Sequence, residues 1–247
     1  TKVEEKLFYS VLNDLKPQLL AFSLVSPNFK LYQRFYPEIK RRGSYKILIG
    51  GWQASLNPEE TIKYCDYLCV GEGEEVILKL IEKIKIGSMP IDVPNIWFKC
   101  SNIIVKQKVE PLNSDLSKYP IPIIDNKCSL YIHNNKIHYE DPYINNVRYG
   151  TNIGRGCPYK CTYCSNSYMV NKVYPGQWSK IRYRTVDHVI AELKQAKEKI
   201  LGLKCINFYD EVFLPQKEWA KEFFKRYKKE INIPFYCMFF PGTCKEE

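Results

Sequence analysis

The chain has 247 residues, of which 45% are hydrophobic, enough for one or two packed domains. It contains no run of about 18 apolar residues that could cross a membrane, and the charged residues 1–6 lack the apolar core of a signal peptide. Its 10 cysteines are too sparse for a small disulfide scaffold. We therefore expect a cytoplasmic protein in which cysteine serves metal binding, catalysis or core packing.

The chain is basic, with a net charge of +10. Such a charge would suit an anionic partner such as nucleic acid. The lysines, however, are spread along expected helices, for example in residues 194–199 and 221–229, rather than gathered into a tail. We therefore do not expect nucleic acid to be a partner.

Strands and helices alternate over the first 87 residues. The apolar periodicity predicts helices over residues 3–15, 32–42, 58–64 and 74–86, and strands over residues 18–24, 46–49 and 67–70. This alternation is typical of βαβ units and of a parallel sheet covered on both faces. Ligands of such sheets bind beyond the carboxyl ends of the strands.

Small residues and glycines follow the three expected strands. Glycine allows the main chain to approach a bulky ligand closely, although each glycine taken alone would serve equally well in a tight turn. The residues that mark these strand ends are Ser23, Gly50, Gly51, Gly71, Glu72 and Gly73. Cys65 and Cys69 lie in the same region, but their apolar neighbours favour buried core thiols over a second metal site.

Prolines are dense over residues 88–146, which favours a linker over regular elements. Within it, residues 96–98 and 103–105 are typical of a small hairpin. His133 and His138 belong to a tyrosine-rich polar stretch, where surface or hairpin positions explain them better than contact with a substrate.

The sequence pattern of residues 147–247 predicts three β/α units. Strands are expected over residues 147–154, 204–208 and 235–240, a helix capped by Thr185 follows the first, and a helix carrying Trp219, Phe223 and Tyr227 follows the second. Asp210 and Glu211 stand at the carboxyl end of the second strand. Barrels built from such units keep their active sites at this end of the strands.

Three cysteines, Cys157, Cys161 and Cys164, lie in the loop after the first of these strands, spaced C-x3-C-x2-C. Thiolates are soft ligands that select iron–sulfur clusters, zinc or Cu(I). A structural zinc site requires four ligands, and no fourth Cys or His follows nearby. Three thiolates on a [4Fe–4S] cluster would leave one iron open for reaction. A structural zinc site and buried reduced thiols remain as alternatives.

The cysteine spacing, with Tyr163 just before the last cysteine, resembles the signature of the radical S-adenosylmethionine (SAM) superfamily. The resemblance implies a [4Fe–4S] cluster on Cys157, Cys161 and Cys164, and SAM bound to the open iron and cleaved by one electron. It also implies that Tyr163 lies near the adenine of SAM, and that Asp210 and Glu211 lie near its amino group.

The series Gly-Gly-Trp-Gln-Ala-Ser, Asn-Pro-Glu-Glu and Gly-Glu-Gly-Glu, within residues 50–74, resembles the cobalamin-binding domain that precedes the barrel in one class of radical SAM enzymes. The resemblance places the six strand-end residues, Ser23, Gly50, Gly51, Gly71, Glu72 and Gly73, around the corrin and its nucleotide tail. Gln53 stands where many relatives carry His, and the D-x-H-x-x-G motif is absent. We therefore expect no axial histidine from this domain.

Together these features predict an α/β protein. Residues 1–87 would form a Rossmann-like (flavodoxin-like) parallel-sheet cobalamin-binding domain, residues 88–146 a linker with a small hairpin, and residues 147–247 the first part of a radical SAM (β/α) partial barrel. Because the first strand and helix of the one domain and the later strands of the other are missing, we expect a fragment of a longer enzyme.

The activity that the resemblance implies is reductive cleavage of SAM and, with cobalamin, modification of an unactivated carbon. Methyl transfer is the expected outcome, with cyclisation or rearrangement also open. The substrate, a small molecule or a peptide, is not identified, and an external donor such as flavodoxin or ferredoxin would supply electrons. The alternatives are a radical SAM enzyme without bound cobalamin and a non-catalytic metal- or cobalamin-binding module.

Overall fold

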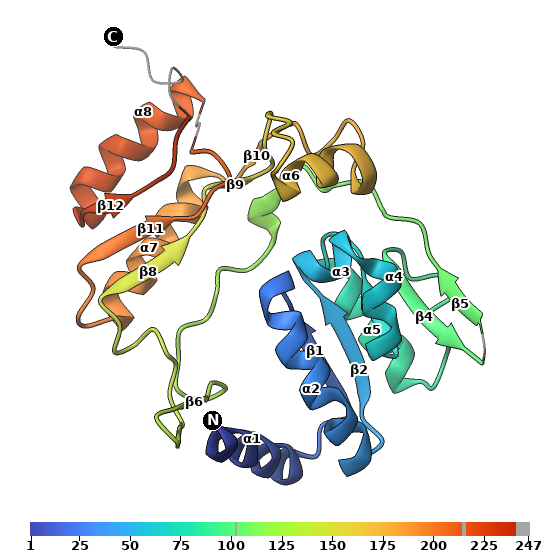
Figure 1. The fold of residues 1–247 in the computed structure, drawn as a ribbon. Coiled ribbons are helices and arrows are strands. Elements are labelled where there is room, and N and C mark those ends of the chain that lie inside the picture. The colour runs from blue at the N-terminus through green and yellow to red at the C-terminus, as the bar shows by residue number, and fades with distance from the viewer. Residues whose placement is uncertain (102, 214–215, 241–247) are drawn as a thin grey trace. The chain divides into compact units, whose positions relative to one another are not determined.

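The computed structural model describes residues 1–101, 103–213 and 216–240 (Figure 1). The chain divides into two compact units. Unit 1 comprises Thr1–Leu7, Asn113–Pro158 and Ser179–Glu247, and unit 2 comprises Phe8–Leu112 and Tyr159–Trp178. The expected linker over residues 88–146 is thus shared between the units, and residues 159–178, which include two of the three loop cysteines, belong to unit 2.

Unit 2 is built on a five-stranded sheet in the order β1-β2-β3-β4-β5. Its strands are β1 (Leu19–Ser23), β2 (Lys46–Gly50), β3 (Tyr67–Cys69), β4 (Ile96–Cys100) and β5 (Ile103–Lys106). The first three strands are parallel, as expected. The predicted hairpin forms, but β4 pairs antiparallel with β3 and so extends the main sheet. The sheet is therefore mixed, and placing the hairpin in a separate linker was wrong.

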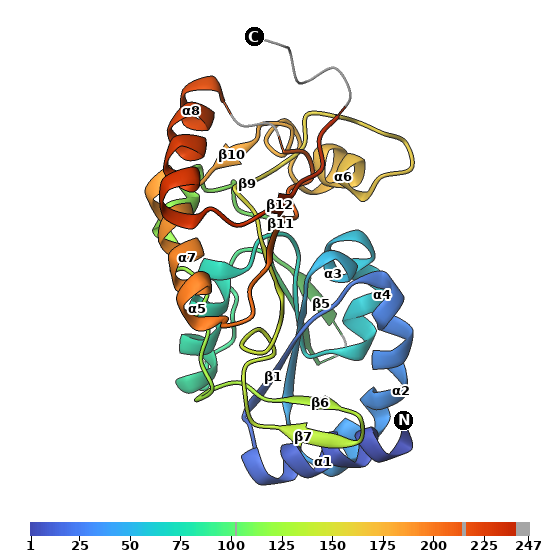
Figure 2. The ribbon, with the colours of Figure 1, turned by 90° about the vertical axis from the view of Figure 1, so that its left-hand side faces the viewer.

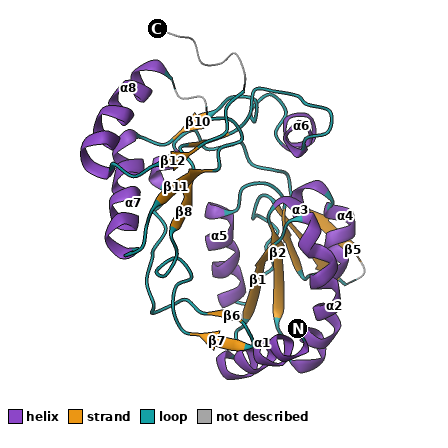
Figure 3. Ribbon diagram, turned by 60° about the vertical axis from the view of Figure 1, so that its left-hand side comes forward, coloured by secondary structure: helices purple, strands orange, loops and turns teal. Residues whose placement is uncertain are grey.

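Helices cover both faces of this sheet (Figure 3). They are α2 (Ser26–Arg42), α3 (Trp52–Leu56), α4 (Pro58–Thr61) with the 3-10 turn Ile62–Tyr64, and α5 (Glu74–Lys85). Helix α1 (Lys2–Leu15) adds Tyr9 and Leu12 to the core of this unit. Strand β2 shows why both faces are buried: Ile47 and Ile49 pack into one hydrophobic cluster with α2, and Leu48 packs into another with α5. Full burial of each such side chain contributes about 1.5–3 kcal/mol.

Two of these helices differ from the prediction. Helix α2 begins at Ser26, well before residue 32, because Pro27 fits the first turn of a helix. The expected helix over residues 58–64 is α4 followed by a 3-10 turn, and it is preceded by α3, which the sequence pattern did not reveal. Helix α3 is only five residues long and has no room for a periodic apolar stripe.

The segment after the cysteines completes the core of unit 2. It forms α6 (Ser165–Tyr168) and the π-helical turn Met169–Val173. Its apolar side chains join the cluster that contains Ile47 and Ile49; they are Met169, Val170, Val173, Tyr174 and Trp178. The chain that follows the cysteine loop is thus anchored in the domain formed by the first hundred residues.

Unit 1 contains a parallel three-stranded sheet in the order β12-β11-β8, formed by β8 (Arg148–Thr151), β11 (Cys205–Phe208) and β12 (Phe235–Tyr236). The short strands β9 (Gly154–Arg155) and β10 (Arg182–Tyr183) pair antiparallel beside it. Its helices are α7 (Val186–Lys199) and α8 (Lys217–Arg226), the latter continued by the π-helical turn Tyr227–Ile231, and the 3-10 turn Leu116–Lys118.

The details of unit 1 follow the local sequence. The Thr185 hydroxyl accepts from the His188 N–H at 3.2 Å, which confirms the expected cap of α7. His133 and His138 lie in a separate hairpin of β6 (Tyr131–His133) and β7 (Lys136–His138), visible in Figure 2.

In the part of the chain that the structure describes, no helix has the length and apolar character needed to span a bilayer.

Candidate cofactor site

The glycines at the carboxyl ends of β2 and β3 have conformations and neighbours that require glycine. Gly51 has φ +84° and Gly71 has φ +88°, a region that other residues rarely adopt. A Cβ atom would lie 2.8 Å from the Leu24 carbonyl oxygen at Gly51 and 2.1 Å from the Tyr174 hydroxyl at Gly71. At both positions the space beside the glycine is therefore filled by the chain itself.

Hydrogen bonds connect the segments that follow β1, β2 and β3 in unit 2. The Leu24 N–H donates to the Gly50 carbonyl at 3.0 Å, and the Gln53 N–H donates to the Leu24 carbonyl at 2.9 Å. The Ser55 hydroxyl accepts from the Gly71 N–H at 2.9 Å. The strand-end residues predicted to hold cobalamin are thus brought together at one edge of the sheet.

The turn at Gly71–Gly73 has two further supports that sequence reasoning missed. The Glu72 N–H donates to the Tyr174 hydroxyl at 2.7 Å, and the Asn95 side-chain amide donates to the Glu72 carbonyl at 2.8 Å. Tyr174 and Asn95 are both buried. They come from segments remote in sequence, so that no local pattern could have indicated the contact.

We expect Gly71→Ala to destabilise the protein more than Gly87→Ala, because only Gly71 has Tyr174 beside it. Gly87 also has a positive φ, +67°, but nothing lies within 4 Å of an added Cβ. Backbone strain should therefore cost about 1–2 kcal/mol at both sites, and overpacking against Tyr174 should add about 2 kcal/mol at Gly71 alone. Urea denaturation of both variants measures this difference, and equal costs would contradict the tight Gly71–Tyr174 contact.

A cavity of about 670 Å³ opens beside these loops in unit 2. This volume lies in the range of small-molecule sites. It is lined by Ser55, Leu56, Asn57, Pro58, Glu59, Glu60, Val70, Trp97, Lys106, Gln107, Lys108, Val109, Tyr168, Lys172 and Val173. Gln53 is buried, and its side-chain amide donates to the Thr61 hydroxyl at 3.2 Å.

Two further cysteines of unit 2, Cys65 and Cys69, are core residues as predicted. Both are buried free thiols. Burial raises the pKa of each thiol to about 12, because the charged thiolate would lose its hydration. They therefore stay protonated near neutral pH.

The three loop cysteines lie on both sides of the boundary between the units. Cys157 is buried in unit 1, and Cys161 and Cys164 are half-buried in unit 2, where the Cys164 N–H donates to the Cys161 carbonyl at 3.0 Å. All three side chains are thiols, a donor set that suits an iron–sulfur cluster. Across the described ranges no three Cys, His, Asp or Glu side chains are gathered around a metal position. The metal-ligand assignment stays a prediction.

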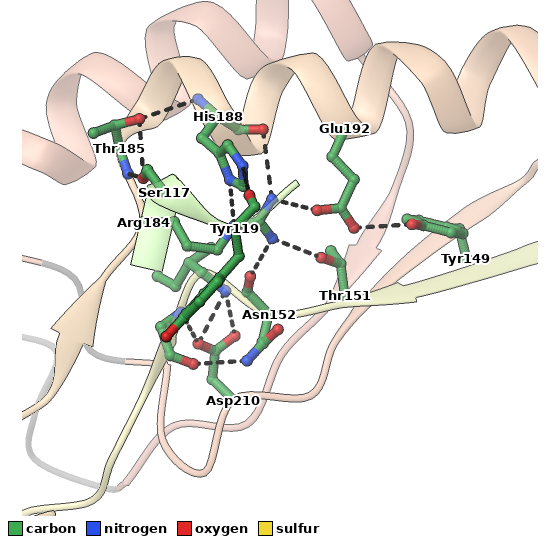
Figure 4. A network of polar contacts seen from close by, with 12 residues as sticks. Ser117, Tyr119, Tyr149, Thr151, Asn152, Arg184, Thr185, His188, Glu192 and Asp210 are labelled. Carbon is green, nitrogen blue, oxygen red and sulfur yellow. Dashed lines mark hydrogen bonds and ion pairs between the residues drawn. The ribbon is translucent and has the colours of Figure 1, made fainter. Parts of the chain in front are cut away.

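Asp210, predicted to lie near SAM, holds the main chain that leads into the cysteine loop (Figure 4). Its carboxylate accepts from the Ile153 N–H at 3.0 Å and from the Gly154 N–H at 2.8 Å. Glu211 is half-buried and receives a main-chain hydrogen bond from Gly156. The two acids thus fix the residues just before Cys157, while the predicted contact of either acid with SAM stays a prediction.

Burial raises the pKa of Asp210 from its usual 3.8 to about 6, although the hydrogen bonds from Ile153 and Gly154 act in the opposite direction. Burial also raises the pKa of Glu211. Because folded Asp210 binds a proton more tightly than the unfolded chain does, its contribution to stability is complete below about pH 4. That contribution is lost as the pH rises through 6, and amounts to on the order of 3 kcal/mol.

We expect Asp210→Asn to remove this pH dependence. Between about pH 4 and pH 7 the free energy of unfolding of the wild type should fall relative to that of the variant, because the amide does not ionise. Denaturant unfolding of both proteins at these two pH values measures the difference. Since all other titrating groups are shared, parallel pH profiles would show that Asp210 titrates normally.

A buried polar network around Arg184 secures the same strand end (Figure 4). Arg184 forms an ion pair with Glu192 of α7 and donates to the Asn152 carbonyl at 2.9 Å and the His188 ring at 2.9 Å. The Tyr149 hydroxyl donates to Glu192 at 2.9 Å. The four-residue spacing of Arg184, His188 and Glu192 was the sequence signal for this network, which sequence reasoning missed.

Tyr163 is the remaining predicted SAM contact. Its side chain is 92% exposed. It lies in unit 2 between Cys161 and Cys164, so within that unit it is open to a ligand bound at the cysteines. Its contact with adenine stays a prediction.

Comparison with known proteins gives concordant matches. Residues 151–247 match the family model of the radical SAM superfamily. An uncharacterized methyltransferase of Pyrococcus horikoshii is 26% identical over 189 residues, which are 74% of this chain and 37% of that protein.

Two solved structures share the fold. The radical SAM methyltransferase TsrM from Kitasatospora setae, with tryptophan substrate and a SAM analog, matches 91% of this chain and 42% of its own with a TM-score of 0.68 and 15% identity. The cobalamin-dependent SAM radical enzyme OxsB, with aqua-cobalamin and SAM, matches 94% of this chain and 31% of its own with a TM-score of 0.66 and 19% identity. The chain thus spans less than half the length of each relative. The α/β prediction, with a parallel-containing sheet before a radical SAM region, is confirmed.

Proposed function

Since the chain contains a radical SAM region at residues 151–247, we propose that it is part of a cobalamin-dependent radical SAM enzyme, with methyl transfer to an unactivated carbon as its reaction. The observation that carries the proposal is the set of three cysteines, Cys157, Cys161 and Cys164, within the matched region and after the parallel strand β8. When bound, a [4Fe–4S] cluster on these thiols supplies one-electron cleavage of SAM, and cobalamin supplies the methyl group.

The residues of unit 1 would orient the cysteine loop. Asp210 and Glu211 hold the main chain from Ile153 to Gly156, so that Cys157 follows a fixed segment. The exposed Tyr163 would contact the adenine of SAM. An external donor such as flavodoxin or ferredoxin would supply the electron, and the substrate would be a small molecule or a peptide.

The residues of unit 2 support a cobalamin site at the carboxyl ends of β1, β2 and β3. Ser23 pairs with Gly50 at the ends of β1 and β2. The Gly71 N–H donates to Ser55, four residues after Gly51, and the adjoining cavity of about 670 Å³ has room for part of a large ligand. The space beside Gly51 and Gly71 is filled by Leu24 and Tyr174, so the ligand would meet the outer side of these loops. The TsrM and OxsB structures with bound cobalamin favour this assignment.

The proposal is tested by anaerobic reconstitution of the full-length protein with iron and sulfide. After reduction it should cleave SAM to methionine and 5′-deoxyadenosine, which chromatography with mass detection measures. A reconstituted protein that leaves SAM intact would refute the enzymatic assignment. Binding of zinc without charge-transfer absorption would instead favour a non-catalytic module.

Cobalamin is tested separately. Full-length protein prepared with hydroxocobalamin and freed of excess by gel filtration should retain corrin absorbance. SAM cleavage without retained corrin would favour the second candidate, a radical SAM enzyme in which the first domain serves as a scaffold.

A further inference from the structure

The sulfur of Cys164 has a directed hydrogen-bond donor. The side-chain amide nitrogen of Asn166 lies 3.6 Å from Cys164 Sγ. Asn166 is buried in the first turn of α6, for which Cys164 is the N-terminal cap. A buried amide with few other partners is an effective donor, because water does not compete for it.

The hydrogen bond from Trp178 fixes the orientation of the Asn166 side-chain amide. Trp178 Nε1 lies 2.9 Å from Asn166 Oδ1. An indole N–H can only donate, so it must face the amide oxygen. The amide nitrogen is then left facing the Cys164 sulfur. This removes the usual ambiguity between the oxygen and nitrogen of an asparagine side chain.

Trp178 is itself held rigidly in the core of unit 2. It is buried, stacks on Tyr174 with ring centroids 5.9 Å apart, and meets Trp52 edge to face at 6.2 Å. Tyr174 in turn receives the hydrogen bond from Glu72. The support behind Asn166 thus runs from the turn at Glu72 to the cysteine through the buried side chains of Tyr174 and Trp178.

We propose that Asn166, oriented by Trp178, donates a hydrogen bond to the Cys164 thiolate and thereby raises the reduction potential of the cluster. This inference rests on the proposed function, in which Cys164 is a cluster ligand. Reduction adds one negative charge that is shared with the ligand sulfurs, so an N–H···S bond stabilises the reduced cluster more than the oxidised one. Asn166 is a positioning residue in this scheme, since it acts through Cys164.

The test is a redox titration of the reconstituted full-length protein, followed by electron paramagnetic resonance. Asn166→Leu keeps the size of the side chain but removes the donor. We expect its one-electron reduction equilibrium to shift about tenfold toward the oxidised cluster, which corresponds to a potential about 59 mV lower. Trp178→Phe keeps the ring in the core but frees the amide to turn, and should shift the potential in the same direction by less.

Ser167→Ala is the matched control. The Ser167 hydroxyl donates to the Cys164 carbonyl at 2.8 Å and not to the sulfur, so its loss should leave the potential unchanged. Potentials equal to the wild type in Asn166→Leu, or in Trp178→Phe if the first variant assembles no cluster, would overturn the inference while leaving the proposed function intact. A wild type that binds no cluster would overturn both.

Discussion

Replacing Cys157, Cys161 and Cys164 together by alanine is expected to abolish iron binding and SAM cleavage completely. These cysteines share one short loop of the region that matches the radical SAM family model. Thiolates are the soft ligands that iron–sulfur clusters prefer, and alanine offers no ligand in their place. Iron and sulfide content per chain and 5′-deoxyadenosine production measure the loss.

Cys128→Ala is a suitable control for this triple variant, because Cys128 is exposed and lies outside the loop. It should keep the iron content and SAM cleavage of the wild type. Iron or SAM cleavage retained by the triple variant would rule out the loop as the cluster site. Equal losses in the control would point to a general effect of removing cysteine.

Replacing Arg184 by methionine is expected to lower the free energy of unfolding by about 3–5 kcal/mol, because it leaves the buried carboxylate of Glu192 without its counter-charge. Arg184 and Glu192 are both buried, and Arg184 also supports the Asn152 carbonyl at the end of β8. Urea denaturation measures the loss. Such a loss is a large part of the stability of a domain of this size.

The double variant Arg184→Met/Glu192→Leu separates charge burial from packing. It removes both charges, so it should be considerably more stable than Arg184→Met alone. A double variant as unstable as the single one would mean that the hydrogen bonds to Asn152 and His188, and not the ion pair, account for the effect of Arg184.

Most helices and strands could be predicted because each carries its own local signal. Strand β2 follows from Ile47, Leu48 and Ile49 between a lysine and two glycines, and the start of α7 follows from Thr185. The pairing of β4 with β3 could not be predicted in this way. A hairpin has the same pattern whether it stands alone or extends a sheet, and only the tertiary packing of Ile96 and Phe98 decides.

The same difference between local and long-range signals holds for the candidate site. The spacing of Cys157, Cys161 and Cys164 is local, so the sequence could indicate it. The supports of the site are not local: Tyr174 reaches Glu72 across about a hundred residues, and Asp210 reaches Ile153 across more than fifty. Position along the chain led to the prediction that Asp210 lies near SAM, but only the structure shows that it holds the main chain before the loop.

The placement of residues 159–178 in unit 2 has a functional consequence under the proposed function. The Cys164 thiol and the turn Gly71–Gly73 share one rigid support through Asn166, Trp178 and Tyr174. A cluster ligand and a cobalamin-binding turn would then keep a fixed spacing within this unit.

Electron paramagnetic resonance of the reduced, reconstituted full-length protein, recorded with and without SAM, most directly tests whether three thiolates leave one iron open for SAM. We expect the signal of a reduced [4Fe–4S] cluster, and we expect SAM to change it by binding the fourth iron. A protein with no such signal, or one whose signal SAM leaves unaltered, would contradict the assignment of a radical SAM centre to Cys157, Cys161 and Cys164.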